Sequence, residues 1–425
     1  MGLPKLKQEA TAARLDGLSL PEGGWSAAAR QDALERVRAM GLPHRRDEYW
    51  RFTNPDTLTS AETPQAAVFD AANEVLWGGV DRIEIVFRDG VFDASSSSAL
   101  EGENLEIGRL AEPQDIHWAK DLYGVLEAKG QVPVARPLAA LNTATATDGV
   151  LIRATGPVGK PVMLRYIHES ESSDATLHHV IRVEAGASLT LLEIGPAAAR
   201  FNKAMEVEIG DGAAFHHIRN QGRAHERRAV TGTFARLGKE STFKSFTLTV
   251  NGRLTRNECV IEMTGDDATA HVAGACVGDG NDFHHDDTVF VTHDAVNCES
   301  RQVFKKVLKN GATGVFQGKI LVQPGAQKTD GYQISQSLLL DGDSQFLAKP
   351  ELEIYADDVA CSHGSTSGAI DDTALFYLRS RGVPKADAQD LLVLAFLAEA
   401  LEEIEDESLA EDLRAQLEGW LARHR

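Results

Sequence analysis

The stretch "HHVIRVEAGASLTLLEIG", residues 178–195, decides the fold. It contains two runs of aliphatic and β-branched residues, which are typical of β-strands, joined by a turn at Gly186. The same layout returns in "MEVEIGDGAAFHHIRN", residues 205–220. From about residue 149 to residue 364 the chain is built of such runs and glycine turns, with almost no helical periodicity. The sequence therefore predicts a long region made of β-strands.

The turn glycines of this region recur at a regular interval. Gly186, Gly212, Gly238 and Gly265 are 26, 26 and 27 residues apart. A fixed spacing of this size is typical of repeat proteins, in which each unit buries its apolar face against its neighbours. We therefore expect a β-helix, or β-solenoid, with these four glycines at equivalent corners. An antiparallel sandwich or barrel is the alternative, because short strands between turns also occur in those folds.

A mixed, partly helical domain is predicted before the strands, over residues 1–148. A helix is expected to start at Ser26, which can cap it, and to stop at Gly41. The segment "RIEIVFRDGVF", residues 82–92, alternates like a strand and turns at Asp89-Gly90. The β-solenoid core is then expected to span residues 149–368.

A C-terminal helical domain is predicted for residues 369–425, where the apolar spacing changes to 3.6 residues. The first helix is expected to start at Asp371 or Asp372 and to stop at Gly382. The third is expected to start with a capping box between Ser408 and Glu411. The apolar face predicted for the second helix consists of Leu391, Ala395, Ala398 and Leu401. The apolar stripe predicted for the third helix consists of Leu409, Leu413, Leu417, Trp420 and Leu421.

Composition excludes some classes of partner. The chain has 425 residues and a formal net charge of −20, which disfavours nucleic acid and anionic membrane as main partners. No apolar run approaches the length of a membrane span, and the first residues lack the apolar core of a secretory signal. The four cysteines, Cys259, Cys276, Cys298 and Cys361, form no CxxC pair. We therefore expect reduced thiols and a cytoplasmic protein.

The first candidate for chemistry lies in "YADDVACSHGSTSGAIDD", residues 355–372. If this segment is a strand, Cys361 and His363 point to the same face, because strand side chains alternate. A thiolate beside an imidazole suits zinc, iron, copper or an iron–sulfur cluster, and it also suits a Cys/His nucleophile pair. A buried small thiol beside an incidental histidine is the alternative. The neighbouring pair Asp357 and Asp358 would point apart, which argues against acid–base catalysis.

The second candidate is "DFHHDDTVFVTH", residues 282–293. Its possible ligands are His284, His285, Asp286, Asp287 and His293. Adjacent histidines of a strand face opposite sides, so His284 and His285 cannot both join one site without a bulge. A solvated polar turn is therefore expected here, with a metal site as the alternative. Similar doublets occur at residues 178–179 and 216–217, which favours a repeat feature over a catalytic one. No phosphate-binding loop and no GxSxG motif is present, so no complete catalytic set is apparent.

One long segment resembles a known family. "PELEIYADDVACSHGSTSGAIDDTALFYLRSRGVPKADAQDLLVLAFLAE", residues 350–399, resembles the C-terminal signature of the SufB/SufD family of iron–sulfur cluster assembly scaffolds. The segments "PHRRDEYWRFT" from Pro43, "CESRQVFKKVL" from Cys298 and "GAQKTDGYQISQSLLL" from Gly325 resemble further family blocks. The length of the chain and the segment "CSHGSTSG" are more similar to SufD members than to SufB members.

The resemblance implies a fold, a set of partners and a site. It implies a right-handed parallel β-helix flanked by helical segments, and a non-enzymatic scaffold that pairs with a SufB-like subunit and two copies of a SufC-like ATPase. It implies that no cofactor is tightly bound by the isolated chain and that a transient iron–sulfur cluster forms in the complex. By position, His363 corresponds to the histidine that acts with a cysteine of the SufB-like partner. Cys361 is its neighbour, with a less defined role.

The resemblance also places the ATPase contact on the C-terminal helices. Phe376, Tyr377, Arg379 and Arg381 are the residues that we expect to make it, because aromatic and arginine side chains are enriched in interface cores. Packing of the two aromatic rings onto the end of the solenoid is the alternative. A homodimer of the isolated chain stays open. Two other functions also stay open: a polysaccharide-acting β-helix enzyme and a simple metal-binding module.

Overall fold

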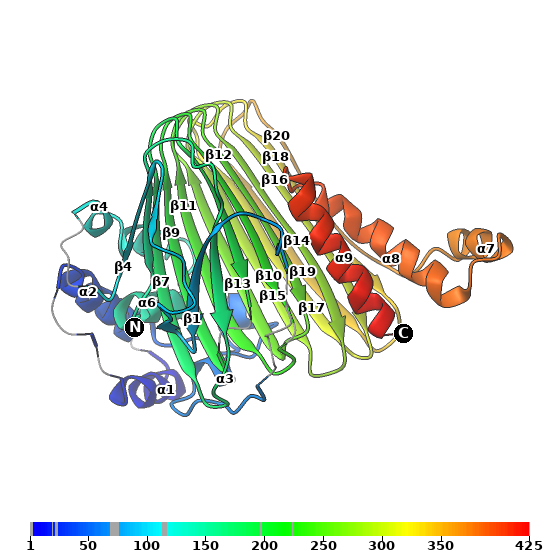
Figure 1. The fold of residues 1–425 in the computed structure, drawn as a ribbon, viewed down its shortest axis with the longest axis horizontal. Helices are drawn as coiled ribbons and strands as arrows, with labels where there is room; N and C mark the ends of the chain where they lie inside the picture. The colour runs from blue at the N-terminus through cyan, green and yellow to red at the C-terminus, as the bar shows by residue number, and fades with distance from the viewer. Residues whose placement is uncertain are drawn as a thin grey trace.

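Two ten-stranded sheets face each other across the core of the molecule (Figure 1). The computed structural model describes residues 3–18, 20–21, 24–68, 76–112, 117–195, 198–222 and 224–424. Successive strands of the central region alternate between the two sheets, and each strand pairs in parallel with the strand two places further along the chain. The chain therefore winds as a parallel β-solenoid of about 7 turns, as predicted. Parallel pairing excludes the antiparallel sandwich.

The strands of the first sheet, here sheet A, follow the order β2-β1-β6-β8-β10-β12-β14-β16-β18-β20. Their bounds are Val91–Phe92, Ile83–Arg88, Val162–Ile167, Ser188–Ile194, Ala214–Gln221, Thr242–Val250, Thr269–Asp279, Glu299–Lys309, Asp330–Leu339 and Ala360–Gly368. Sheet B follows the order β3-β4-β5-β7-β9-β11-β13-β15-β17-β19. Its bounds are Glu101–Gly102, Leu105–Arg109, Val150–Ala154, Asp174–Val183, Arg200–Ile209, Arg228–Leu237, Leu254–Met263, His284–His293, Thr313–Val322 and Gln345–Ile354.

The core lies between the sheets and is built as rows of side chains that stack from coil to coil. Because the strands are parallel and in register, residues of neighbouring coils stand one above another, as Leu189, Phe215 and Phe243 do. These three side chains are almost completely buried in a single cluster that draws on both sheets. Burying a side chain of this kind contributes about 1.5–3 kcal/mol. Alternation along each strand sends the remaining residues to the outer face, where the helices pack.

The four turn glycines lie in the corners that join sheet B to sheet A, but they do not occupy equivalent positions there. Gly186 and Gly212 lie two residues before the next strand, with φ of +70° and +65°. The same position in later coils is left-handed as well, but it is occupied by Glu240, Asp267 and Asn297. Glycine is favoured there because it adopts positive φ without strain, but it is not obligatory.

Gly238 and Gly265 occupy a second position in the same row of corners, four residues before the next strand. A Cβ atom at Gly265 would lie 2.0 Å from the backbone nitrogen of Lys239 in the preceding coil. These glycines therefore permit close stacking of the turns. The prediction of four equivalent positions is wrong, because two different constraints produce a nearly constant spacing.

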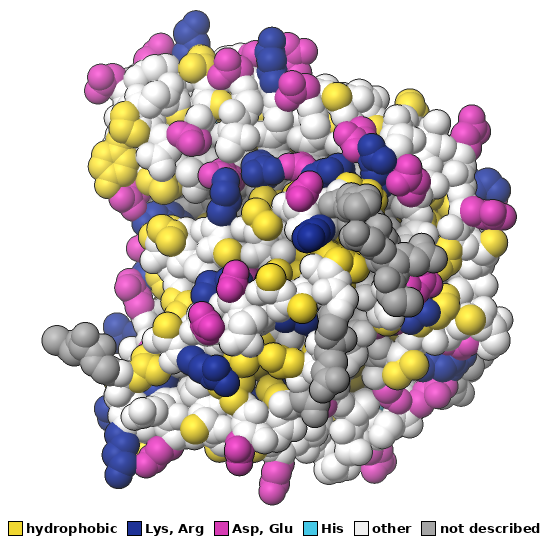
Figure 2. Space-filling model, turned by 90° about the vertical axis from the view of Figure 1, so that its left-hand side faces the viewer, with side chains coloured by type: hydrophobic (Ala, Val, Ile, Leu, Met, Phe, Trp, Pro, Cys, Tyr) yellow, Lys and Arg dark blue, Asp and Glu magenta, His cyan; other side chains and the backbone are white. Residues whose placement is uncertain are grey.

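The N-terminal region covers the outer face of sheet B and closes the first end of the solenoid. Its helices are α1 (Lys5–Asp16), α2 (Ala27–Met40), the 3-10 helix η1 (Glu48–Trp50), α3 (Asp56–Thr59), α4 (His117–Lys120), α5 (Val125–Lys129) and α6 (Pro137–Thr145). The predicted hairpin is confirmed: β1 and β2 pair antiparallel around Asp89 and Gly90. The strands that precede the predicted boundary at residue 148 add to both sheets, because β1 pairs with β6 and β4 pairs with β5. Figure 2 shows acidic and basic side chains interspersed on this side of the molecule.

The predicted helix between Ser26 and Gly41 is confirmed as α2. Ser26 stands at the N-cap position, but its side chain makes no capping bond. Its hydroxyl instead accepts a hydrogen bond from Nε of Arg30 at 3.0 Å. Gly41 ends the helix with φ of +64°.

The C-terminal helices are α7 (Asp372–Ser380), α8 (Lys385–Leu401) and α9 (Glu407–Arg423). Helices α8 and α9 lie on the outer face of sheet A, whereas α7 projects away from the solenoid (Figure 1). Asp371 caps α7 by accepting bonds from the backbone of Thr373 and Ala374, as predicted. None of the helices in the described segments is long and apolar enough to span a bilayer.

Two details of these helices differ from the prediction. The stripe of α9 is confirmed, since Leu409, Leu413, Leu417, Trp420 and Leu421 are all buried. Its cap is Asp406, whose carboxylate accepts from the backbone of Ser408, because the helix starts one residue before the predicted capping box. The buried face of α8 consists of Ala388, Val393, Leu397, Ala400 and Leu401. Leu391 is half exposed, because the sheet contacts a face of α8 rotated from the predicted one.

Candidate functional site

The last coil of the solenoid, formed by β19 and β20, is the candidate site. Each of these strands pairs on one side only, with β17 and β18 respectively. Within the described residues no strand covers the other edge of either one. The final layer of the core is therefore left as a surface, called here the open end and defined as residues 345–354 and 360–368.

Cys361 and His363 lie on the same face of β20, the face that points into the solenoid, as predicted. Cys361 is in register with Gly331 on β18, and its thiol packs among Ile320 and Val322 of sheet B. Burial raises the pKa of the Cys361 thiol, against a smaller opposing effect of the Gly331 backbone. The thiol is therefore held protonated, which makes it a poor nucleophile in the isolated chain.

His363 is exposed although it stands in a row of core residues. It is in register with Gln333 on β18, which is completely buried, and Gln333 is in register with Gln302 on β16. One more coil would bury His363 in the same way. The exposure of the imidazole therefore results from the end of the solenoid.

Two serines complete a polar inner face that the sequence reasoning did not identify. The hydroxyls of Ser335 and Ser365 lie 3.2 Å apart, and those of Ser337 and Ser367 lie 2.9 Å apart. Because these pairs connect equivalent positions of β18 and β20, the serine row points inward beside His363. The signal was present in "CSHGSTSG": the alternate residues of this segment are Cys, His, Ser and Ser, and none is a large apolar side chain.

The second candidate, the segment of residues 284–293, is divided between the two faces of β15. His284 and Asp286 point outward, where the hydroxyl of Thr53 contacts both, at 3.0 Å from His284 Nε2 and 2.5 Å from Asp286 Oδ2. Arg256 binds the same carboxylate at 2.5 Å and also donates to the backbone oxygen of Tyr49 at 2.8 Å. The outer half of this candidate therefore anchors the segment "YWRFT" of the N-terminal region to sheet B.

The inner half of that candidate belongs to a buried polar network. Lys306 donates to Asp287 at 2.6 Å and lies 2.8 Å from Nδ1 of His285. His293 points inward as well and lies 2.8 Å from the hydroxyl of Ser300. The solvated polar turn predicted for this segment is wrong, because residues 284–293 form the mostly buried strand β15. The three histidine doublets each place one ring inside and one outside, as alternation along a strand requires. Among the described residues, no three His, Cys, Asp or Glu side chains are grouped as metal ligands would be.

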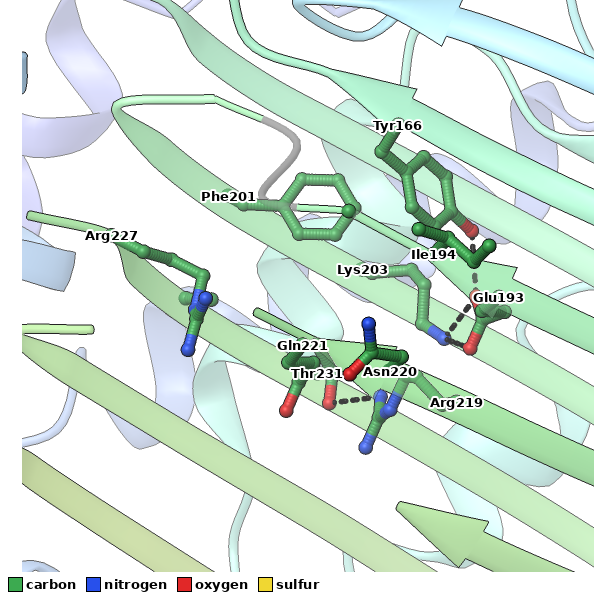
Figure 3. Close-up of a pocket in the computed structure, with 12 residues that line it drawn as sticks. Tyr166, Glu193, Ile194, Phe201, Lys203, Arg219, Asn220, Gln221, Arg227 and Thr231 are labelled. Carbon is green, nitrogen blue, oxygen red and sulfur yellow. Dashed lines mark hydrogen bonds and ion pairs between the residues drawn. The ribbon is translucent and has the colours of Figure 1, made fainter. Parts of the chain in front are cut away.

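The first coils contain an ion pair inside the solenoid (Figure 3). Lys203 donates to both carboxylate oxygens of Glu193, at 2.7 and 2.6 Å, and the hydroxyl of Tyr166 donates to the same carboxylate at 2.6 Å. His217 lies 2.8 Å from it. Burial alone raises the pKa of Glu193, but Lys203 and His217 hold that pKa well below its usual range. The pair is therefore ionised and satisfied, which suits a structural role.

The neighbouring cavity is small and lies apart from the open end. It measures about 10 Å³, which is room for about one water molecule. Arg219 lies at its wall and donates to Thr231 at 2.8 Å (Figure 3). Cys276 is buried and Cys259 is half-buried on the inner face of the solenoid, and burial raises the pKa of both thiols to about 12. No substrate-sized site is formed by these residues.

Helix α7 presents the residues predicted for a partner. Phe376 is 74% exposed and Tyr377 is 56% exposed, and none of the described side chains of α7 is buried. The guanidinium of Arg381 lies over the Tyr377 ring at 4.9 Å, and Arg379 is exposed. Packing of the two rings onto the end of the solenoid is therefore wrong for the single chain.

Asp357 and Asp358 are exposed in the turn before β20. The backbone of Asp358 is held by Gln327 at 2.9 Å. The predicted strand position of this pair is wrong, because the chain turns from sheet B to sheet A between β19 and β20, and strand alternation does not apply there.

This architecture, a parallel β-solenoid with helices toward both termini, defines the class of parallel β-solenoid proteins. The sequence model described as "SUF system FeS cluster assembly, SufBD core domain" matches residues 166–396, which is more than half of the chain. The chain belongs to the SufB/SufD family of iron–sulfur cluster assembly proteins.

Relatives within the family extend this match to nearly the whole chain. The iron–sulfur cluster assembly protein SufD of Escherichia coli is 28% identical over 93% of this chain and 93% of its own length. An iron–sulfur cluster assembly SufBD family protein of Synechocystis is 28% identical over 91% of this chain and 89% of its own length. SufD of Bacillus subtilis is 27% identical over 93% and 94%, respectively. The similarity therefore includes both helical ends.

Proposed function

We propose that this chain is the SufD-like scaffold subunit of a cluster assembly complex and that an iron–sulfur cluster forms at its open end. The observation that carries the proposal is the exposed His363 in a row of core residues on an uncovered β-strand. A neutral imidazole binds ferrous iron and also ligates iron–sulfur clusters. One histidine beside a protonated thiol is an incomplete site, so the remaining ligands come from a partner.

The partner proposed for the open end is a SufB-like subunit. Two free parallel edges with exposed backbone groups favour strand addition by another chain, which supplies main-chain hydrogen bonds. A partner solenoid placed edge to edge would bring its own last coil beside His363. The cluster is then a product of the assembled complex, and the isolated chain holds no cofactor and has no catalytic activity of its own.

The partner proposed for α7 is a SufC-like ATPase. An exposed aromatic pair next to two arginines on a helix without buried residues has the composition of an interface centre. The reaction is assigned to the cytoplasm, where thiols stay reduced, in keeping with the four free cysteines. A second chain of the same kind at the open end is the alternative arrangement in the absence of a SufB-like subunit.

The test is anaerobic reconstitution of the cluster in the complex with SufB-like and SufC-like subunits. His363→Ala is expected to reduce the cluster yield at least tenfold, read by visible absorbance and iron content. Its melting temperature should stay unchanged, because loss of an exposed side chain removes little packing. Cys361→Ser should have a smaller effect, since the thiol is protonated and lies beside the ligand. A normal cluster yield with His363→Ala would contradict the proposal.

A polysaccharide-acting enzyme and a metal-binding module receive no support from a specific observation. The inner histidines are bonded to neighbouring side chains such as Glu193, Lys306 and Ser300. Among the described residues, the exposed aromatic rings are those of Phe376 and Tyr377 on α7 and of Tyr355 directly after β19, and they form no row along the solenoid.

A further inference from the structure

A ladder of two glutamine amides ends directly beside His363. Gln302 on β16 and Gln333 on β18 point into the solenoid and are both completely buried. Nε2 of Gln333 donates to Oε1 of Gln302 at 2.6 Å. The next residue of the same row is His363, in register with Gln333 on the last strand. The ladder therefore reaches the candidate site through one strand-to-strand step.

The outer end of the ladder is an acceptor without a partner. Oε1 of Gln333 is buried and accepts no hydrogen bond from the described residues. A buried carbonyl without a donor costs about 1–3 kcal/mol. Nε2 of Gln302 at the inner end of the ladder has no partner among the described residues either, but only Oε1 of Gln333 lies next to a further polar side chain of the row, the ring of His363.

The position of the Gln333 amide is fixed from the opposite sheet. A Cβ atom at Gly318 on β17 would lie 2.4 Å from Nε2 and 2.7 Å from Oε1 of Gln333. The amide therefore fills the space that the missing side chain of Gly318 leaves. With Gln302 on one side and Gly318 opposite, its Oε1 has only the direction of β20 in which to find a donor.

The distance between strands permits a bond to His363. Adjacent strands lie about 4.8 Å apart, and the side chains of Gln302 and Gln333 bridge that spacing with a hydrogen bond of 2.6 Å. The step from Gln333 to His363 is the same spacing in the same row. A histidine that binds a metal usually donates its second ring N–H to an oxygen acceptor, which fixes the tautomer and the ring orientation.

We propose that Gln333 is a positioning residue for His363. Its Oε1 accepts the ring N–H of the imidazole, holds one tautomer and leaves the other ring nitrogen free to bind iron at the open end. The bond to His363 is a property of this chain alone, whereas its use in iron binding rests on the proposed function. The proposal also gives a role to the two buried amides, which stand in a row that carries the apolar Val272 one coil earlier.

The test measures the tautomer of His363 in the isolated, metal-free chain by ¹⁵N chemical shifts of the neutral ring. The wild-type ring is expected to show one dominant tautomer. Gln333→Met, which is isosteric and has no strong acceptor, should bring the two tautomers to the ratio of an exposed histidine. Gln333→Glu keeps an acceptor and should restore the wild-type tautomer. Gln302→Met is the matched control: it breaks the inner bond of the ladder, leaves Oε1 of Gln333 in place and should not change the tautomer.

Two outcomes overturn the inference. One is an identical tautomer ratio in the wild type and Gln333→Met. The other is a wild-type ring in which the nitrogen that faces Gln333 carries no proton, because the amide would then donate the hydrogen bond to the ring. Iron binding is measured separately in the complex, where Gln333→Met should weaken ferrous iron about tenfold to hundredfold. A tautomer change combined with a normal cluster yield for His363→Ala would overturn the proposed function and leave the hydrogen bond established.

Discussion

The two ends of the solenoid differ in how they finish their sheets. At the first end, the sheets finish with β2 and β3, which are two residues long and pair antiparallel with β1 and β4. At the open end, they finish with β19 and β20, which have ten and nine residues and pair in parallel. The inner residues of β1 are Ile83, Ile85 and Phe87, all buried, whereas the inner residues of β20 are polar.

The difference indicates which end serves as an interface. Long unpaired strands invite pairing with other chains, and proteins usually protect them with short strands, charges or covering elements. At the first end this protein uses very short strands. At the open end β19 carries Lys349, Pro350, Glu351 and Glu353, whereas the nine residues of β20 include no Lys, Arg, Asp, Glu or Pro. This contrast supports the proposal that the β20 edge of the open end receives a partner and that its polar row belongs to the shared site.

The largest expected effect comes from blocking the open edge itself. Ala360 donates its N–H to the backbone oxygen of Thr329, the residue directly before β18. The N–H groups of alternate residues such as Ser362 therefore also face β18, and that of Ser365 faces away. Ser365→Pro removes an outward donor and should weaken SufB-like binding about a hundredfold, or roughly 3 kcal/mol. Titration calorimetry measures this effect.

A proline on the other side of the strand is the control for that experiment. Ser362→Pro removes an N–H that bonds within the sheet, so it should lower the melting temperature of the isolated chain. Ser365→Pro should lower it less, because it removes only the hydroxyl contact with Ser335. Equal binding by Ser365→Pro and the wild type would show that the partner does not add a strand at this edge.

The second effect concerns the helix that projects beyond the solenoid. Phe376→Ala or Tyr377→Ala should weaken binding of the SufC-like ATPase about thirtyfold, or roughly 2 kcal/mol, as expected for an interface centre. Circular dichroism should be unchanged, because α7 has no buried residue. Leu413→Ala on α9 is the matched contrast: it should cost about 2–5 kcal/mol of stability. ATPase affinity that is insensitive to both aromatic changes would remove α7 from the interface.

The third effect compares glycines at the two ends. Gly90 in the β1–β2 turn has φ of +83°, and a Cβ atom there would lie 2.7 Å from Cβ of Ala175. Gly90→Ala should therefore lower the free energy of unfolding by about 1–2 kcal/mol or more. At the open end, a Cβ on Gly364 meets nothing nearer than Ile334 at 3.9 Å, so Gly364→Ala should be nearly neutral. Similar losses in urea unfolding for the two variants would show that the ends are equally well packed.

The last comparison concerns the polar interior between the ends, whose contribution is absent near neutral pH and develops only as the pH falls. Burial lowers the pKa of His293 to about 4, from about 6.5 in the unfolded chain. The unfolded state binds this proton first as the pH falls, so the folded state loses about 1.4 kcal/mol per pH unit between about pH 6.5 and 4. His293→Gln should remove that slope, whereas Ser300→Ala, which removes only the bonded hydroxyl, should keep it. A slope that is the same in wild type and His293→Gln would mean that this ring does not titrate on unfolding.

The solenoid could be predicted from sequence because its signal is local and repeated. Strand runs and turn glycines recur with the period of one coil, and each coil buries the same rows. The difference between the glycines could not be predicted. Gly212 is favoured by a positive φ, whereas Gly265 is favoured by the close approach of the backbone of the preceding coil. Spacing alone does not distinguish these two constraints.

The candidate site could be predicted only in part for a similar reason. Alternation placed Cys361 and His363 on one face, and the family resemblance selected them. The contribution of Gln302 and Gln333 depends on pairing between strands about 30 residues apart, which no local pattern reveals. The same holds for Thr53, which contacts His284 and Asp286 from the opposite part of the chain.

Amide hydrogen exchange of the chain, alone and bound to a SufB-like subunit, tests the central claim most directly. In the isolated chain the outward amides of β19 and β20 should exchange rapidly, because nothing in the described structure accepts their hydrogen bonds. In the complex their protection should rise at least tenfold, while that of β1 to β4 at the first end stays the same. Unchanged exchange in β19 and β20, or new protection at the first end instead, would contradict the assignment of the open end as the shared site.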